Sequence, residues 1–134
     1  GQIGCLETYA SAASIGRRYT ARTGTVVSGS DDVVARLGND PAADAVWAEA
    51  IEALALALAT TTLLIDPGVI VLGGGLARAG DTLLRPLSAR LTARLAWRPA
   101  PPIELSVLGT DAGWRGAALL AWAAGSVPAT TGVS

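Results

Sequence analysis

Three consecutive glycines, Gly73 to Gly75, follow a short apolar run and are well suited to meet a ligand through the backbone. Glycine lets the backbone approach a ligand closely and adopt positive φ. A glycine turn between a strand and a helix often receives a phosphate or a nucleotide. The spacing is not G-x-G-x-x-G, because Arg78 stands at the last glycine position, and it is not a P-loop. A tight strand-to-helix turn explains the glycines as well, so the residues alone leave both interpretations open.

Cys5 and Glu7 are the other residues near a helix start whose types could do chemistry. A thiolate could bind a metal, and a carboxylate could accept hydrogen bonds from hydroxyl groups. Taken alone, a single cysteine is usually a small buried apolar residue. A glutamate in a first helical turn is usually a solvated acid that suits the helix dipole. Asp111 can be explained as a helix cap, and Arg78 as an ordinary exposed arginine.

The composition excludes several kinds of catalytic site. All ten basic residues are arginine, and the chain contains no histidine and one cysteine. Without lysine there is no P-loop lysine or Schiff base. Without histidine there is no Ser-His-Asp triad. One cysteine cannot form an internal disulfide or a thiolate metal site by itself.

Charge and hydropathy favour a globular protein of the cytoplasm. The net charge of −1 gives no indication of attraction to nucleic acid or to a membrane surface. Residues are 51% hydrophobic, which is too apolar for a disordered chain. The apolar stretch from Ala53 to Ile65 is shorter than the roughly 20 residues of a membrane span. We therefore expect no membrane partner.

Periodicity and punctuation residues divide the chain into helices and two strands. Asp40 and Pro41 are a strong helix start, an acidic N-cap followed by proline at the first helical position. Val69 to Leu72 is a β-branched run typical of a buried parallel strand. We expect the helix after Pro41 to be buried on more than one side. The spacing predicts helices over 6–23, 31–37, 40–64, 81–95 and 112–124, and strands over 69–72 and 103–108.

The order of these elements predicts an α/β protein with a parallel sheet. Two strands are too few for such a sheet to stand alone. We therefore expect part of a domain whose remaining strands come from residues not present here. The isolated chain should then be poorly soluble or partly molten, and a sharp, cooperative thermal transition would contradict this. We expect residues 125–134 to form a disordered tail.

Three segments together resemble the ROK family of sugar kinases and sugar-sensing repressors. Gly1 to Ser11 is similar to the second half of the family's zinc and sugar motif, and Asp66 to Gly75 to its second glycine motif. Leu108 to Gly113, followed by Gly116 to Ala118, looks like the closing motif. Each segment alone is weak, but the ordered set is specific and covers most of the chain.

The resemblance implies a partial actin-like ATPase fold, which is ribonuclease-H-like, with two lobes around a cleft. Residues 1–110 would belong to the larger, carboxy-terminal lobe, without its upstream strands. Residues 111–124 would form a closing helix that packs towards the smaller lobe.

The resemblance also implies an activity, the phosphorylation of a hexose or an N-acetyl-hexosamine with ATP and Mg²⁺, as in a glucokinase-like enzyme. Glu7 would bind sugar hydroxyls, and Gly73, Gly74 and Gly75 would lie beside the nucleotide. Cys5 would be one ligand of a structural Zn²⁺, provided that the other ligands are supplied from upstream. The complete protein would be a homo-oligomer, a dimer.

The same resemblance leaves alternatives. The family's catalytic aspartate and phosphate loop have no counterpart in the sequence, so no catalytic residue is assigned and the chain alone should be inactive. A sugar-sensing repressor would share this region and would bind DNA through an amino-terminal domain. A third alternative is an inactive product of a truncated gene. Which sugar is bound cannot be read from these residues.

Overall fold

The computed structural model describes residues 4–95 and 97–125. The predicted 125–134 tail falls outside these residues, except for Gly125, which belongs to the last helix. In chain order the elements are α1 (Glu7–Ala10), α2 (Ala12–Thr23), α3 (Ser30–Val34), α4 (Pro41–Ile65), β1 (Ile70–Leu72), the 3-10 turn η1 (Gly75–Ala79), α5 (Asp81–Arg94), β2 (Ile103–Leu105), the 3-10 turn η2 (Gly109–Asp111) and α6 (Ala112–Gly125).

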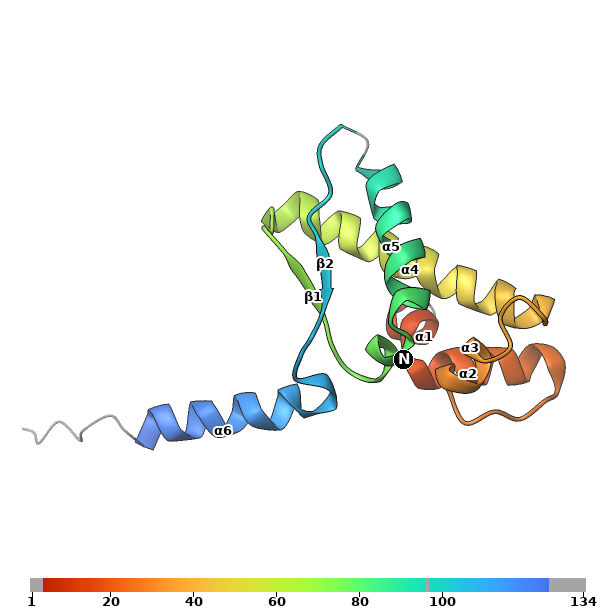
Figure 1. The fold of residues 1–134 in the computed structure, drawn as a ribbon, viewed down its shortest axis with the longest axis horizontal. Helices are drawn as coiled ribbons and strands as arrows, with labels where there is room; N and C mark the ends of the chain where they lie inside the picture. Colours follow the sequence, from red (N-terminus) through yellow and green to blue (C-terminus); the bar gives the residue numbers. More distant parts are fainter. Residues whose placement is uncertain (1–3, 96, 126–134) are drawn as a thin grey trace, which may run out of the picture.

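The two strands pair in parallel, as the sequence predicts, and α5 connects them. Ile70 lies opposite Ile103, and Leu72 opposite Leu105. In Figure 1, α4 passes behind the two strands and α5 lies beside them. The inward residues Ile70 and Ile103 pack on the helical core, whereas Val71 on the opposite face is 58% exposed. One face of the sheet is thus uncovered within the described residues.

The central helix, α4, carries most of the core. Its buried residues pack with α2, α3 and α5 around fully buried Ile15, Val46 and Leu87. Asp40 accepts a hydrogen bond from the backbone N–H of Ala42 (2.8 Å) and caps the helix, as Asp40 and Pro41 predict. The expectation that this helix is buried on more than one side holds for its amino-terminal part only, because its last turns leave large apolar residues exposed: Leu56, Leu63, Leu64 and Ile65.

By length and composition, α4 could cross a membrane, and it is the one such helix among the described residues. The core helix of a globular protein passes the same test. The polar contacts of α4 favour this second interpretation. Glu49 forms ion pairs with Arg18 and Arg22 of α2, and Glu52 with Arg90 and Arg94 of α5. These charges hold α4 between its two neighbouring helices.

The predicted helix over 6–23 is divided in two. Ser11 adopts an extended conformation (φ −81°, ψ 149°), and its Oγ accepts a hydrogen bond from the backbone N–H of Ser14 (3.2 Å). Serine is a strong N-cap residue, so it ends α1 and starts α2 in a new direction. Gly16 of α2 then lies against Gly29, where an added Cβ would come within 2.8 Å of the Gly29 Cα. This contact places α3 against α2.

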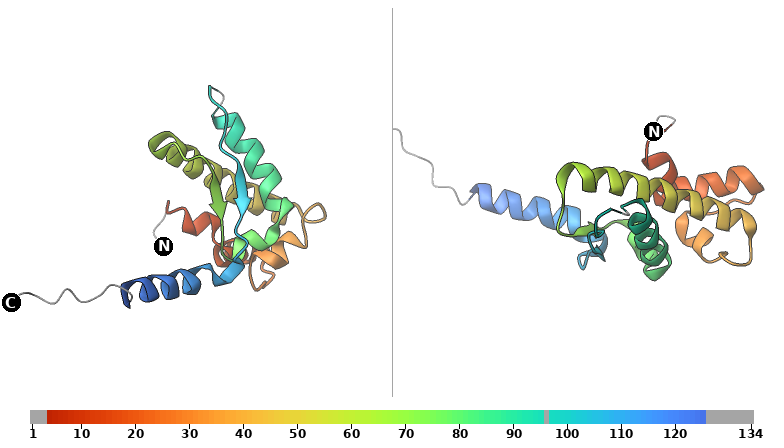
Figure 2. Two further views of the ribbon diagram at one scale, coloured as in Figure 1. Left: turned by 60° about the vertical axis from the view of Figure 1, so that its left-hand side comes forward. Right: turned by 90° about the horizontal axis from the view of Figure 1, so that it is seen from above.

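The last helix, α6, is formed as predicted but has no buried residue. Figure 2 shows it projecting away from the other helices in both views. Its large apolar residues are all exposed: Trp114, Leu119, Leu120 and Trp122. Strand β2 ends at Leu105 rather than at residue 108, because its partner β1 ends at Leu72 and the chain then turns away.

Candidate functional site

The glycine turn lies at the carboxyl end of β1, as the sequence predicts. Gly74 has φ +78°, a conformation that side chains other than glycine rarely adopt. A Cβ at Gly73 would lie 3.6 Å from the Ser106 Cβ, and one at Gly75 would lie 3.7 Å from the Ala12 Cβ. The turn therefore fits closely between the end of β2 and the start of α2.

A cavity of about 310 Å³ opens beside this turn. Gly73 and Gly75 line one side of it, and Ala10 to Ala12, the junction of α1 and α2, line another. The remaining lining is apolar: Leu54, Leu72, Leu76, Ala77 and Leu83. The end of α1 and the start of α2 thus face the glycine turn across this cavity.

Glu7 itself lies at the start of α1, is exposed, and lines a different, larger cavity of about 730 Å³. Thr8, Ser14, Arg17 and Arg18 share that cavity. The Glu7 carboxylate makes no hydrogen bond or ion pair with any described residue, although two arginines lie in the same cavity. Arg18 is paired with Glu49, and Arg17 donates to the buried Ser14 Oγ (2.5 Å). The carboxylate oxygens of Glu7 are therefore free to accept hydrogen bonds from a ligand.

Cys5 is exposed, and its carbonyl oxygen accepts hydrogen bonds from the N–H and the Oγ1 of Thr8. No group of three or more potential metal ligands occurs among the described residues. A structural zinc site needs four ligands, usually cysteine and histidine, and this sequence holds one cysteine and no histidine. The residues of this chain therefore do not by themselves fit a zinc ion.

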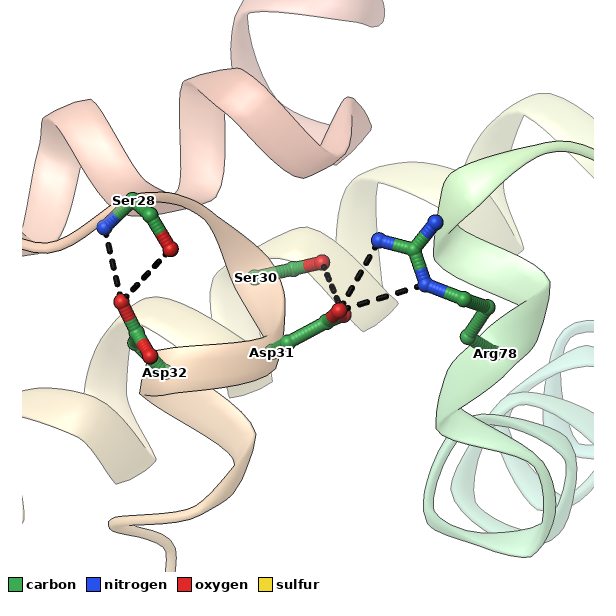
Figure 3. Close-up of polar contacts among 5 residues, drawn as sticks. All are labelled: Ser28, Ser30, Asp31, Asp32 and Arg78. Atoms are coloured by element: carbon green, nitrogen blue, oxygen red, sulfur yellow. Dashed lines mark hydrogen bonds and ion pairs between the residues drawn. The ribbon is translucent and has the colours of Figure 1, made fainter.

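Asp31 and Arg78 form a contact that the sequence does not reveal. The Nε and NH2 groups of Arg78 both donate to Oδ2 of Asp31, at 3.2 and 2.9 Å (Figure 3). The two residues are 47 positions apart, so no local pattern could have paired them. On the other side of α3, Asp32 accepts hydrogen bonds from the N–H and Oγ of Ser28 (2.7 and 2.8 Å), which hold the pKa of Asp32 below its ordinary value.

Asp111 lies at the end of η2, where its carboxylate is 3.6 Å from the guanidinium of Arg115 on the next turn of α6. This exposed pair is four residues apart on the chain and makes a local contribution only. Asp111 lines neither of these two cavities.

The described residues thus hold a glycine turn beside one cavity and an unpaired carboxylate, that of Glu7, in another. Comparison with known proteins identifies the class. The model of the ROK family matches residues 1–124, and the chain belongs to this family.

Relatives and solved structures agree with this match. The chain is similar to the N-acetylgalactosamine kinase AgaK of Shewanella sp. strain ANA-3, at 33% identity over 90% of this chain and 39% of the relative. It is also similar to the glucokinase of Halalkalibacterium halodurans, at 33% identity over 84% of this chain and 39% of the relative. The ROK hexokinase of Thermus thermophilus has a TM-score of 0.80 and 32% identity over 92% of this chain and 42% of that one.

A ROK family glucokinase from Streptomyces griseus, solved in complex with glucose and AMPPNP, has a TM-score of 0.68 and 27% identity over 90% of this chain. It is covered over 45% of its length. The chain thus spans about two fifths of the length of the relatives it matches. Its fold is the corresponding part of the actin-like fold of these kinases, and the sequence-based prediction of this fold and family is confirmed.

Proposed function

We propose that this chain is part of an ATP-dependent sugar kinase that phosphorylates a hexose or an N-acetyl-hexosamine. The observation that carries the proposal is the cavity that the end of the Glu7 helix shares with the glycine turn, with Ala10 to Ala12 on one side and Gly73 and Gly75 on the other. A kinase of this type must hold a sugar and a nucleotide next to each other. The kinase relatives and the glucokinase complex with glucose and AMPPNP support the same activity.

Glu7 is proposed to bind the sugar. A carboxylate can accept hydrogen bonds from two neighbouring hydroxyl groups, and these bonds are stronger than those between neutral groups. The Glu7 carboxylate has no partner among the described residues, which supports this role. A carboxylate with a structural role would be expected to pair with Arg17 or Arg18 in the same cavity.

Gly73, Gly74 and Gly75 are proposed to lie against the nucleotide, so that the adenosine or the phosphates can approach the backbone. ATP would be the phosphoryl donor, and Mg²⁺ would neutralise charge on its phosphates. No residue of this chain is assigned as the catalytic base. Cys5 is proposed to be a zinc ligand only where other residues complete the site, since this chain offers one thiolate.

The arrangement of the complete protein is also a proposal. Residues 1–110 would belong to the larger lobe, and the helix over 111–124 would pack towards the smaller one. The exposed apolar side chains of α6 support this, because they are uncovered within the described residues. We further propose a cytoplasmic homodimer. The relatives named above are kinases, which favours a kinase over a DNA-binding repressor.

The test is an assay of sugar-dependent ATP consumption by the encoded polypeptide, expressed with any coding sequence upstream of Gly1. Glucose, other hexoses and N-acetyl-hexosamines form the panel. We expect turnover with at least one of them, and no turnover with any would overturn the kinase proposal. Glu7→Gln should lower kcat/KM for the sugar by about tenfold to a hundredfold, because it weakens hydrogen bonds to a charged group.

Glu104→Gln is the matched control, since Glu104 is an exposed glutamate on β2 that lines neither cavity. It should leave kcat/KM unchanged. A loss of activity that is equal in the two variants would contradict the role of Glu7.

A further inference from the structure

The 3-10 turn η1 begins at the last of the three glycines and leads into α5. Gly74 and Gly80 flank η1 (Gly75–Ala79), and both have positive φ, at +78° and +56°. Within the turn, the N–H of Ala77 donates to the Gly74 carbonyl (3.2 Å), and the N–H of Gly80 donates to the Ala77 carbonyl (3.1 Å). These local bonds shape η1, but they do not fix its position relative to the helices.

Contacts with the core, with α3 and with η2 hold η1 in position. Leu76 and Ala79 pack against the edge of the main core cluster. On the other side, the guanidinium of Arg78 reaches Asp31 at the start of α3 with two hydrogen bonds to one carboxylate oxygen (Figure 3). Asp31 also lies within 3.4 Å of the Ser30 hydroxyl, and Ser30 is buried. The ion pair thus joins η1 to an anchored point of α3.

The same guanidinium lies beside Gly75, the last residue of the glycine turn. A Cβ placed on Gly75 would be 3.7 Å from the Arg78 NH1 and 3.9 Å from its NH2. The head group of Arg78 therefore borders the space next to Gly75, in the turn that is proposed to lie beside the nucleotide. Asp31 holds this cation in place, so a change at Asp31 reaches the turn through Arg78.

The pair contributes little to global stability. The side chains of Arg78 and Asp31 are 56% and 58% exposed, and solvent screens ion pairs of this kind strongly. A contact that adds little to folding but joins the segment next to the glycine turn to the start of α3 is suited to positioning.

We propose that Asp31 and Arg78 are a positioning pair, which sets the orientation of the glycine turn for the nucleotide. This inference rests on the proposed function, because it concerns the nucleotide side of the same site. Asp31 acts through Arg78 and does not itself touch the nucleotide. The pair should therefore affect the KM for ATP and leave the KM for the sugar unchanged.

The test compares Asp31→Asn with Asp81→Asn in the encoded full polypeptide. Asp81 is the matched control, because its Oδ2 accepts the same two hydrogen bonds from Arg85 (3.2 and 3.0 Å). Both residues lie in α5. The side chains of Arg85 and Asp81 are 82% and 70% exposed, which is more than those of Arg78 and Asp31. Asp31→Asn should raise the KM for ATP about threefold to tenfold with little change in kcat. Asp81→Asn should change neither.

Two further variants separate positioning from a merely structural role. Asp31→Glu keeps the charge and should recover most of the affinity for ATP. Arg78→Lys keeps the charge but loses the fork of two donors, so it should behave like Asp31→Asn. Equal values of KM for ATP in wild type, Asp31→Asn and Asp81→Asn would overturn the proposal, as would a matching rise in the KM for the sugar.

A measurement that needs no activity keeps this test separate from the kinase proposal. Hydrogen exchange of the amides of Ala77 and Gly80 reports how firmly η1 is held. Asp31→Asn should accelerate their exchange, and Asp81→Asn should not. If the wild type has no kinase activity but this difference is found, the proposed function fails and the restraint of the turn stands. If exchange is unchanged by Asp31→Asn, the positioning pair is refuted whatever the activity.

Discussion

The helical core and α6 are both rich in apolar residues, but only one of them is covered. Ile15, Val46 and Leu87 have no solvent exposure, and they come from three helices that pack against one another. In α6, Trp114 and Leu120 are 60% and 74% exposed, and no residue of that helix is buried. Helix propensity alone accounts for α6, since alanine and leucine dominate its sequence.

This difference teaches that apolar composition does not decide burial without a partner of matching shape. Helices α2, α3, α4 and α5 cover one another's apolar stripes. The outward face of β1 is exposed, and α6 has no buried residue. The helical core is therefore expected to unfold as a unit. The stability of α6 is expected to depend on whether another surface covers it.

The largest expected effect comes from paired alanine substitutions in the two regions. Leu87→Ala removes a fully buried side chain and should lower the free energy of unfolding by about 2–5 kcal/mol. Leu120→Ala should change it by less than about 0.5 kcal/mol. Urea denaturation of the wild type and both variants measures the change in the free energy of unfolding. Equal losses would show that α6 is part of the same core. A broad, non-cooperative wild-type transition would support the sequence-based expectation of a partly molten chain.

An acid-sensitive contact within the core region should have the next largest effect. The Tyr19 hydroxyl donates to Oδ2 of Asp40 (2.6 Å), and this bond, together with the N–H of Ala42, holds the pKa of Asp40 below its ordinary value of 3.8. A lowered pKa means that the folded state favours the ionised carboxylate. Its stabilisation is present above pH 3.8 and is lost as the pH falls through the lowered pKa.

Tyr19→Phe keeps the buried ring but removes the hydroxyl, so its melting temperature should fall less steeply than that of the wild type as the pH is lowered below about 4. Asp40→Asn should flatten the same dependence. Asp81→Asn, at an exposed pair on α5, is the control for loss of an acid elsewhere. Parallel curves for Tyr19→Phe and wild type would refute the contribution of this bond.

The smallest expected effect is on tryptophan fluorescence, which distinguishes the buried core from the exposed positions. Trp47 is 6% exposed and donates its Nε1–H to the Thr82 carbonyl (3.3 Å), whereas Trp97, Trp114 and Trp122 are 60–74% exposed. The red shift of tryptophan emission on unfolding should therefore come mainly from Trp47. Trp47→Phe should abolish most of this shift, and Trp114→Phe should keep it. A full shift in Trp47→Phe would mean that α6 is covered in solution.

Much of the fold could be predicted because its signals are local. Asp40 and Pro41 mark the start of α4 through capping chemistry, and the β-branched run before Gly73 marks β1. The sequence does not predict the break at Ser11, because the residues on both sides of it favour a helix. Within such a run, a serine that caps a helix cannot be told from a serine inside one. The turn η1 was missed because it is short and stands between two glycines.

The candidate site was predicted in part. The resemblance drew attention to Glu7, Cys5 and the glycine turn, and the position of that turn at the end of β1 agrees with the pattern. Their roles stay predictions. The partnership of Asp31 with Arg78 could not be predicted, because each is an ordinary exposed charge in its own segment.

The sequence by itself determined the family, the order of the elements and the location of the glycine turn, because caps, β-branched runs and glycines act over a few residues. Only the tertiary structure decided which side chains meet. It placed the junction of α1 and α2 across a cavity from Gly73 and Gly75, and it joined Arg78 to Asp31. It also left α6 uncovered while α4 was enclosed by α2 and α5. These outcomes depend on long-range packing, in which a residue's partners are chosen by shape and proximity in space rather than by spacing along the chain.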